Sequence, residues 1–174
     1  LIIKKYGDDL QNGSIVATHG EKGPQAAILP PGWHFGYFPL LYTLESVKNI
    51  NITKGNIGVL TAKDGKSLPE GEIFAPAWAD TKEMLDAVKF LEKGFKGPQL
   101  TVLPPGQYRY NPRLFEIEIT PALEIPVGSV GVIKSNSGLI HNPKDGETID
   151  VNGVPIVPNG FRGIWEDALQ PNAY

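Results

Sequence analysis

Three histidines and a few paired acids are the side chains of this sequence best suited to catalysis or metal binding. His19, His34 and His141 lie far apart in loop-like contexts, and none has a second histidine four residues away, the spacing that places two metal ligands on one helix face. A catalytic site would also need a nucleophile, a base and oxyanion donors close together. We recognise no such combination and predict no catalytic residue, no metal site and no cofactor; the chain is not expected to be an enzyme.

Glu116 and Glu118 come closest to an acid pair. They are two residues apart in a predicted strand, so their side chains share one face. They alternate with Phe115, Ile117 and Ile119, a pattern typical of a strand that is buried on one side and wet on the other. We therefore favour a solvated strand face over a hydrolytic pair.

The two glycine motifs of the sequence are better explained by a role in the backbone than by phosphate binding. Gly55-x-x-Gly58 and Gly128-x-x-Gly131 lack the lysine and the strand-to-helix context of a phosphate-binding loop. Glycine inside a predicted strand instead indicates a bulge or a close approach of another segment.

Aromatic residues are the remaining candidates for binding. Trp33, Trp78 and Trp165 could stack on a planar ligand, but packing in the core is favoured, and Trp78 is expected to hold a helix against the sheet. If the chain binds a ligand, the candidates are the aromatic residues of its repeats: Trp33, Tyr37, Tyr42, Tyr108 and Tyr110.

Composition narrows the class of protein. The 174 residues are 41% hydrophobic and 20% charged, which is typical of a globular chain with a core. The net charge of -3, with both signs interspersed, argues against a nucleic-acid surface. The absence of cysteine excludes disulfides and thiolate sites. The 20 glycines and 16 prolines are dispersed among apolar residues, which favours many short strands and turns.

The chain repeats itself. GPQAAILPPGWHFGYFP begins at Gly23 and GPQLTVLPPGQYRYNP at Gly97, a shift of 74, and a third copy, GIWEDALQPNAY, begins at Gly163 at a shift of 66. Each unit predicts a Leu-Pro-Pro-Gly turn flanked by short strands, then a strand like 115–119, then a third strand like 127–135. Such units must pack against each other to bury their apolar faces.

One segment follows a different periodicity. Asp80 and Glu83 form a capping box, apolar residues then recur at helical spacing, and Gly94 stands where the helix should end. This predicts one inserted helix over 80–94. A hairpin is predicted over 148–157, with its turn at Asn152-Gly153.

These elements predict an α+β, predominantly β fold: tandem β-repeat subdomains of short antiparallel strands with one inserted helix. We expect a first subdomain over 1–79, the helix over 80–94, a second subdomain over 95–140, and a hairpin with a truncated third repeat over 141–174. Leu1-Ile2-Ile3 followed by Lys4-Lys5 is either a first strand or the remainder of a removed anchor, and both interpretations stay open.

The repeat resembles the band 7 or SPFH family (stomatin, prohibitin, flotillin, HflK/C), in particular its bacterial, flotillin-like branch. The resemblance rests on turn and strand motifs: Gly97-Pro98-Gln99, Leu103-Pro104-Pro105-Gly106, Tyr108, Asn111-Pro112 and Ile125-Pro126-Val127-Gly128-Ser129-Val130-Gly131-Val132. The later stretch, from Gly163-Ile164-Trp165 to Leu169-Gln170-Pro171, resembles the region that leads into the next strand of that family.

The resemblance implies a non-enzymatic scaffold at the bacterial cell membrane that self-associates and organises lipid microdomains or membrane proteins such as proteases. Family members carry an N-terminal membrane anchor and a long coiled coil, so the resemblance implies that this chain is a fragment of such a protein. It implies homo-oligomers of the full-length protein, and no nucleic-acid partner is expected. The alternative is a β-repeat ligand-binding module that uses the exposed aromatic residues.

Overall fold

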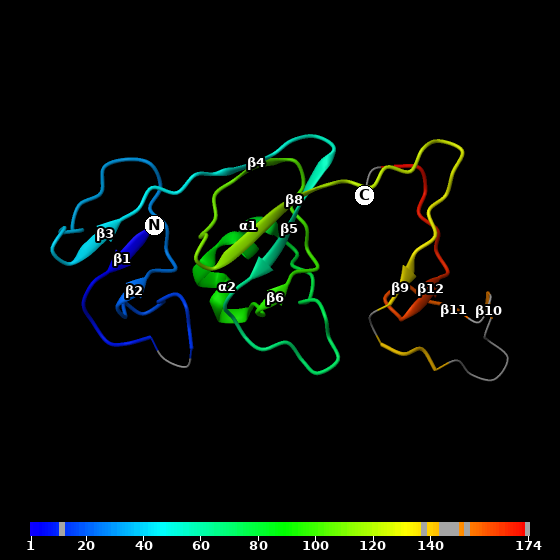
Figure 1. Ribbon diagram of the computed structural model, residues 1–174, viewed down its shortest axis with the longest axis horizontal. Coiled ribbons are helices and arrows are strands. Elements are labelled where there is room, and N and C mark those ends of the chain that lie inside the picture. The colour runs from blue at the N-terminus through cyan, green and yellow to red at the C-terminus, as the bar shows by residue number, and fades with distance from the viewer. Residues whose placement is uncertain (11–12, 137–138, 143–149, 152–153, 173–174) are drawn as a thin grey trace. The chain divides into compact units, whose positions relative to one another are not determined.

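The computed structural model describes residues 1–10, 13–136, 139–142, 150–151 and 154–172. It confirms an α+β, predominantly β fold built from short strands that pair mostly in antiparallel fashion (Figure 1). The elements are β1 Ile2–Lys4, β2 Gly23–Pro24, β3 Tyr42–Leu44, β4 Ile50–Ile52, β5 Asn56–Ala62, α1 Thr81–Leu85, α2 Ala87–Lys93, β6 Gly97–Pro98, β7 Gly106–Tyr108, β8 Phe115–Pro121, β9 Lys134–Ser135, β10 Asp150–Val151, β11 Val154–Val157 and β12 Gly163–Trp165.

The chain forms two compact units. The first comprises residues 1–68 and 74–120, and the second comprises 69–73 and 121–174. Both helices therefore belong to the first unit, as do the first copy of the repeat and the second copy as far as Thr120. The second unit holds a sheet of order β10-β11-β12-β9.

The first two copies of the repeat form three-stranded sheets with the same strand order. In the first copy β1 lies between β2 and β3, and in the second copy β5 lies between β6 and β8. The registers match: Lys4 is opposite Gly23, as Ala62 is opposite Gly97 and Ser135 is opposite Gly163. The strand at the start of each repeat (β2, β6 or β12) therefore pairs with the strand that comes before that repeat in the sequence. Neighbouring repeats thus share a sheet.

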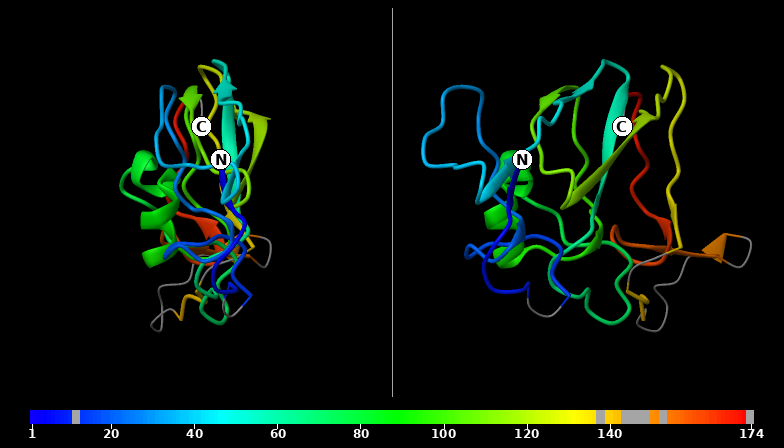
Figure 2. Two further views of the ribbon diagram at one scale, coloured as in Figure 1. Left: turned by 90° about the vertical axis from the view of Figure 1, so that its left-hand side faces the viewer. Right: turned by 60° about the vertical axis from the view of Figure 1, so that its left-hand side comes forward.

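The first unit has a core of apolar side chains between its strands and helices. Trp78 stacks on Phe90 with ring centroids 5.5 Å apart, and Phe90 meets the edge of Phe115 at 4.8 Å. Both helices lie on the same side of β5 and β8 (Figure 2). The largest fully buried side chains of this cluster are those of Leu60, Met84, Phe90, Leu103, Leu114 and Phe115.

The prediction of one continuous helix over 80–94 is wrong, because Asp86 divides it into α1 and α2. Asp86 has extended backbone angles, and its carboxylate accepts hydrogen bonds from the N–H groups of Val88 and Lys89 as the N-cap of α2. An aspartate that caps a new helix competes with continuation of the old one. Asp80 caps α1 through the N–H of Lys82, and Gly94 ends α2 in an extended conformation.

The predicted strands differ in how far they form. The strand over 115–119 is confirmed by β8, whereas the stretch 127–135 forms only β9 and a bridge at Gly131, because a turn at Val127-Gly128 bends the chain. The strands expected around the first Leu-Pro-Pro-Gly turn are absent from the described structure of 27–35.

The two turn glycines also differ. Gly32 has a φ of 138°, as a turn glycine can, whereas Gly106 lies in β7 with no positive φ. The hairpin of β10 and β11 is confirmed by its pairing. Its turn at 152–153 and the start of its first strand at 148–149 lie outside the described residues.

Candidate functional site

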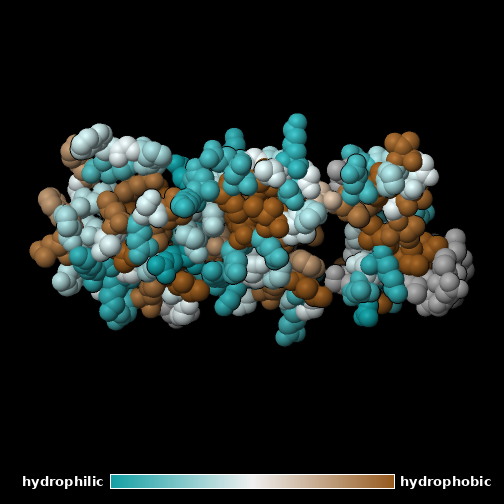
Figure 3. All heavy atoms as spheres, turned by 45° about the horizontal axis from the view of Figure 1, so that its top comes forward, coloured by the Kyte–Doolittle hydropathy of each residue, from teal (hydrophilic) through white to brown (hydrophobic). Residues whose placement is uncertain are grey.

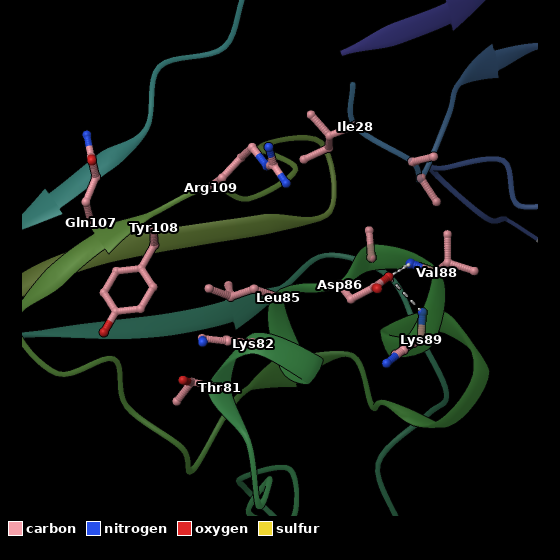
Figure 4. A pocket seen from close by; sticks show the side chains of 13 residues that line it. Ile28, Thr81, Lys82, Leu85, Asp86, Val88, Lys89, Gln107, Tyr108 and Arg109 are labelled. Atoms are coloured by element: carbon pink, nitrogen blue, oxygen red, sulfur yellow. Dashed lines mark hydrogen bonds between the residues drawn. The ribbon is translucent and has the colours of Figure 1, made fainter. Parts of the chain in front are cut away.

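A cleft of about 840 Å³ opens on the first unit, between the two helices, the segment 26–28 and the strand β7 (Figure 4). The break at Asp86 creates one wall, because it exposes the start of α2 beside the end of α1. The lining residues are Ala26, Ala27, Ile28, Thr81, Lys82, Leu85, Asp86, Ala87, Val88, Lys89, Gln107, Tyr108 and Arg109.

The cleft has an apolar floor and a mostly basic rim. Leu85 and Ala87 are buried, and three cationic side chains line the cleft: Lys82, Lys89 and Arg109. Asp86 is the acid of the lining, and its carboxylate oxygen is 3.1 Å from the N of Val88 and 3.3 Å from the N of Lys89. This combination suits an amphipathic or anionic ligand, since the acid is already engaged in capping.

A second surface lies in the loop that we call the aromatic loop, residues 33–41. Trp33 is 92% exposed and Phe35 is 87% exposed, and Figure 3 shows apolar atoms collecting at this end of the first unit. Three more large apolar residues of the loop are also exposed: Phe38, Leu40 and Leu41. Soluble proteins seldom expose so many large apolar side chains in one place without a binding function.

Local contacts shape the aromatic loop. The N–H groups of Leu41 and Tyr42 donate to the carbonyl of Phe38, and the ammonium of Lys5 donates to the carbonyl of Pro39 at 2.6 Å. Tyr37 meets Tyr42 edge to face, with ring centroids 5.3 Å apart. The loop is therefore tied down at its far end, while Trp33 and Phe35 extend from its start.

The five aromatic candidates fall into three places. Trp33 and Tyr37 lie in the aromatic loop, with Tyr42 against Tyr37; Tyr108 lines the cleft; Tyr110 packs against the core. The structure thus does not bring them together. Sequence reasoning missed the cationic rim of the cleft and the exposed Phe35, Phe38 and Leu40, since no local pattern distinguishes them from ordinary surface or strand residues.

The tryptophans have three different environments. Packing of Trp78 against the helix is confirmed by its stack on Phe90, and the ammonium of Lys93 lies 5.0 Å from its ring. Trp165 is half-buried, and its indole N–H donates to the carbonyl of Phe161 at 3.0 Å. The prediction that Trp33 packs in the core is wrong, because that side chain is almost fully exposed.

The residues considered for catalysis have structural surroundings. His34 Nε2 lies 2.6 Å from the carbonyl of Pro30, and the ring of His141 meets that of Phe161. The solvated face of β8 is confirmed: Glu116 and Glu118 are exposed, and Glu116 forms an ion pair with Lys63 at 3.5 Å. Within the described ranges, no three His, Asp or Glu side chains gather as a metal site would require.

The close approach predicted for the strand glycines is also confirmed. A Cβ on Gly58 would lie 2.6 Å from Ile52 Cδ1, and one on Gly131 would lie 2.5 Å from Ile125 Cδ1. Each of these glycines makes room for an isoleucine side chain.

No protein family, no curated protein and no solved structure matches this chain. In the part of the chain that the structure describes, neither helix has the length and apolar character needed to cross a bilayer.

Proposed function

We propose that the chain is the β-rich, extramembrane portion of a non-enzymatic scaffold of the band 7 type, which self-associates at a membrane and organises membrane proteins or lipid microdomains. The observation that carries this proposal is the aromatic loop. Its Trp and Phe side chains are of the kind that settle at the interface of a bilayer, and Lys5 at its base supplies a positive charge.

The repeat architecture supports the same role. Repeats that share a sheet with their neighbours are typical of proteins that act by binding. The resemblance to band 7 sequences over Gly97 to Val132 adds to this proposal.

The first test concerns assembly. The longest protein encoded around this sequence is purified in mild detergent, and its mass by light scattering is compared with that of the 174-residue chain. The scaffold proposal expects a discrete assembly of many subunits for the longer protein. If the longer protein runs as a monomer, the proposal fails.

The second test concerns the membrane surface. The chain is sedimented with vesicles containing about one third anionic lipid, and the double variant Trp33→Ser/Phe35→Ser is expected to lose most of the bound fraction. The matched control is Val127→Ser/Val130→Ser, which removes two exposed apolar residues from the second unit. Equal binding by both double variants would show that the aromatic loop is not the contact.

The cleft favours a second candidate function, a ligand-binding module. Its apolar floor and cationic rim fit a small anionic or amphipathic molecule. A ligand that binds there would raise the melting temperature of the chain in a saturable way. Lys89→Ala and Arg109→Ala should each reduce that shift, while Lys48→Ala, at an exposed position outside the lining, should leave it unchanged.

A further inference from the structure

A glycine recurs at one position in all three copies of the repeat. Gly20, Gly94 and Gly160 each stand three residues before the glycine that begins the copy. Gly20 and Gly160 have positive φ angles of 87° and 92°, a backbone conformation that residues with a side chain rarely adopt. The turn of the third copy therefore requires glycine at 160, whichever residue precedes it.

The residue before this glycine differs between the copies. It is His19 in the first, Lys93 in the second and Asn159 in the third. All three residues are exposed. The first two copies are each followed by another copy and still expose this position, so the exposure of Asn159 is a property of the repeat. In the third copy, an asparagine followed by glycine thus lies in an exposed turn.

An asparagine followed by glycine can modify itself. The backbone N of Gly160 attacks Cγ of Asn159, and the new C–N bond closes a succinimide ring. The bond between Cγ and Nδ2 breaks, and Nδ2 leaves as ammonia with the proton of the Gly160 N–H. Water then opens the ring at either carbonyl, which leaves aspartate or isoaspartate at position 159. Water is the only co-reactant.

The surroundings of Gly160 leave its nitrogen accessible for this attack. Gly160 is exposed, and a Cβ placed on it would have no neighbour within 4 Å. No described residue accepts a hydrogen bond from its N–H, so the nitrogen is free to lose its proton to hydroxide. The N–H of Phe161 donates to the carbonyl of Pro158 at 3.3 Å and closes the turn around Asn159 and Gly160.

The side chain of Asn159 is held by one contact. Its Nδ2 donates a hydrogen bond to Oδ2 of Asp167 at 2.9 Å. A bond to an ionised carboxylate is stronger than one between neutral groups, and it must break before the amide nitrogen can leave. The leaving nitrogen must also gain a proton, which an ionised carboxylate cannot supply. Asp167 therefore opposes the cyclisation of Asn159.

We propose that Asn159 is a site of spontaneous deamidation and that Asp167 slows the reaction. The product places a carboxylate where Asn159 now presents a donor to Asp167, and the two like charges repel. The contact between the β11–β12 connection and the segment after β12 is then lost, and the second unit gains one negative charge. Isoaspartate also lengthens the backbone of that connection, which joins two parallel strands. This inference does not depend on the proposed scaffold function.

The first experiment locates the modification. The 174-residue chain is incubated in mildly alkaline buffer, digested and analysed by mass spectrometry with fragmentation, because the sequence also contains Asn12-Gly13 and Asn152-Gly153. The peptide that holds Asn159 should convert to two products of equal mass, aspartate and isoaspartate, and the rate should rise with pH. Asn159→Gln, whose longer side chain cyclises poorly, is the control. A native chain in which Asn159 stays unconverted overturns the proposal.

The second experiment measures the restraint by Asp167. Asp167→Ala should raise the rate of deamidation about three- to tenfold, as expected for the loss of one hydrogen bond to a charged group. Asp167→Asn keeps an oxygen acceptor and should stay within about twofold of the native rate. In concentrated urea, where the contact is absent, all three chains should deamidate at the same rate. A folded Asp167→Ala variant that deamidates at the native rate refutes the restraint.

Hydrogen exchange distinguishes the restraint from a general loosening of the second unit. The amides of β12 should exchange at the same rate in the native chain and in Asp167→Ala, because the hydrogen bond lies outside the strands. Faster exchange throughout β12 in the variant would assign its faster deamidation to a loosened sheet and would contradict the proposal.

Discussion

The side chain of Asn111 donates a hydrogen bond to the carbonyl of Ala26, 85 residues earlier in the chain, at 3.0 Å. The same amide nitrogen lies 3.0 Å from the carbonyl of Gln25, and the amide oxygen accepts the N–H of Arg113. Asn111 is fully buried. One side chain of the second repeat therefore satisfies two backbone carbonyls of the first.

Replacement of Asn111 should destabilise the first unit. Asn111→Ala leaves two carbonyls without a donor and is expected to cost about 2–4 kcal/mol of unfolding free energy. Asn111→Asp should cost more at pH 7, since it places a carboxylate against two carbonyl oxygens. Urea denaturation measures both, with Asn51→Asp on the exposed face of β4 as the control. Equal stability of the aspartate variant and the native chain would contradict this account.

Gly58 should not tolerate a methyl group. A Cβ there would lie 2.6 Å from Ile52 Cδ1 and 3.2 Å from Leu103 Cβ, and Ile52 has little room to move because it is buried. We expect Gly58→Ala to cost about 1–3 kcal/mol, as overpacked cores do. Ile52→Val removes the closest atom, so the double variant should be more stable than the sum of the two single changes predicts. Strict additivity in thermal or urea denaturation would argue against the contact.

Asp86 should be more important as a cap than as a charge. Asp86→Ala removes both hydrogen bonds to the start of α2 and should cost about 1 kcal/mol. Asp86→Asn keeps an acceptor and should retain most of that stability, although it makes the rim of the cleft more positive. Chemical denaturation of the two variants separates the roles. An asparagine variant as unstable as the alanine variant would indicate that the charge dominates.

Glu21 should make part of the stability depend on pH. Its own backbone N–H and that of His19 hold the pKa of Glu21 below its ordinary value of 4.5. Because the folded pKa is depressed, this stabilisation is present above pH 4.5 and is lost as the pH falls through the folded pKa. Glu21→Gln should therefore be less stable than the native chain at pH 7, and the difference should shrink at acidic pH. Melting temperatures at pH 7 and pH 3 check this, with the exposed Glu118→Gln as the control.

The positions of the strands could be predicted from the sequence better than the pairing between them. Alternation of apolar and charged residues located β8, because burial of one face of a strand imposes that pattern locally. Pairing depends on contacts between distant segments, and here β5 pairs with β6 of the following copy. A sequence read one unit at a time does not contain that information.

Two local predictions failed for identifiable reasons. The periodicity of Met84, Val88 and Leu91 continues past Asp86, so it concealed the capping bonds that divide the helix. The aromatic residues after Gly32 have strand propensity, but a strand also requires a neighbour. Without one among the described residues, Trp33 is exposed although its type suggested the core.

The candidate sites were the least predictable feature. Lys82 and Lys89 reach the cleft from the helices, and Arg109 reaches it from the end of β7. Their charges are ordinary for exposed positions, and only the packing of the helices beside β7 brings them together. Of the aromatic candidates, Tyr108 is the one that lines this cleft.

The strand pairs β1/β2 and β5/β6 have the same register, but the connections between their strands differ in length. Lys4 and Gly23 are joined by a short connection, and Ala62 and Gly97 by a longer one that carries both helices. The fold therefore accommodates a longer segment at this junction without a change in strand alignment. An affinity tag or a small domain inserted beside the exposed Gly13, in the short connection, should leave the native sheets assembled.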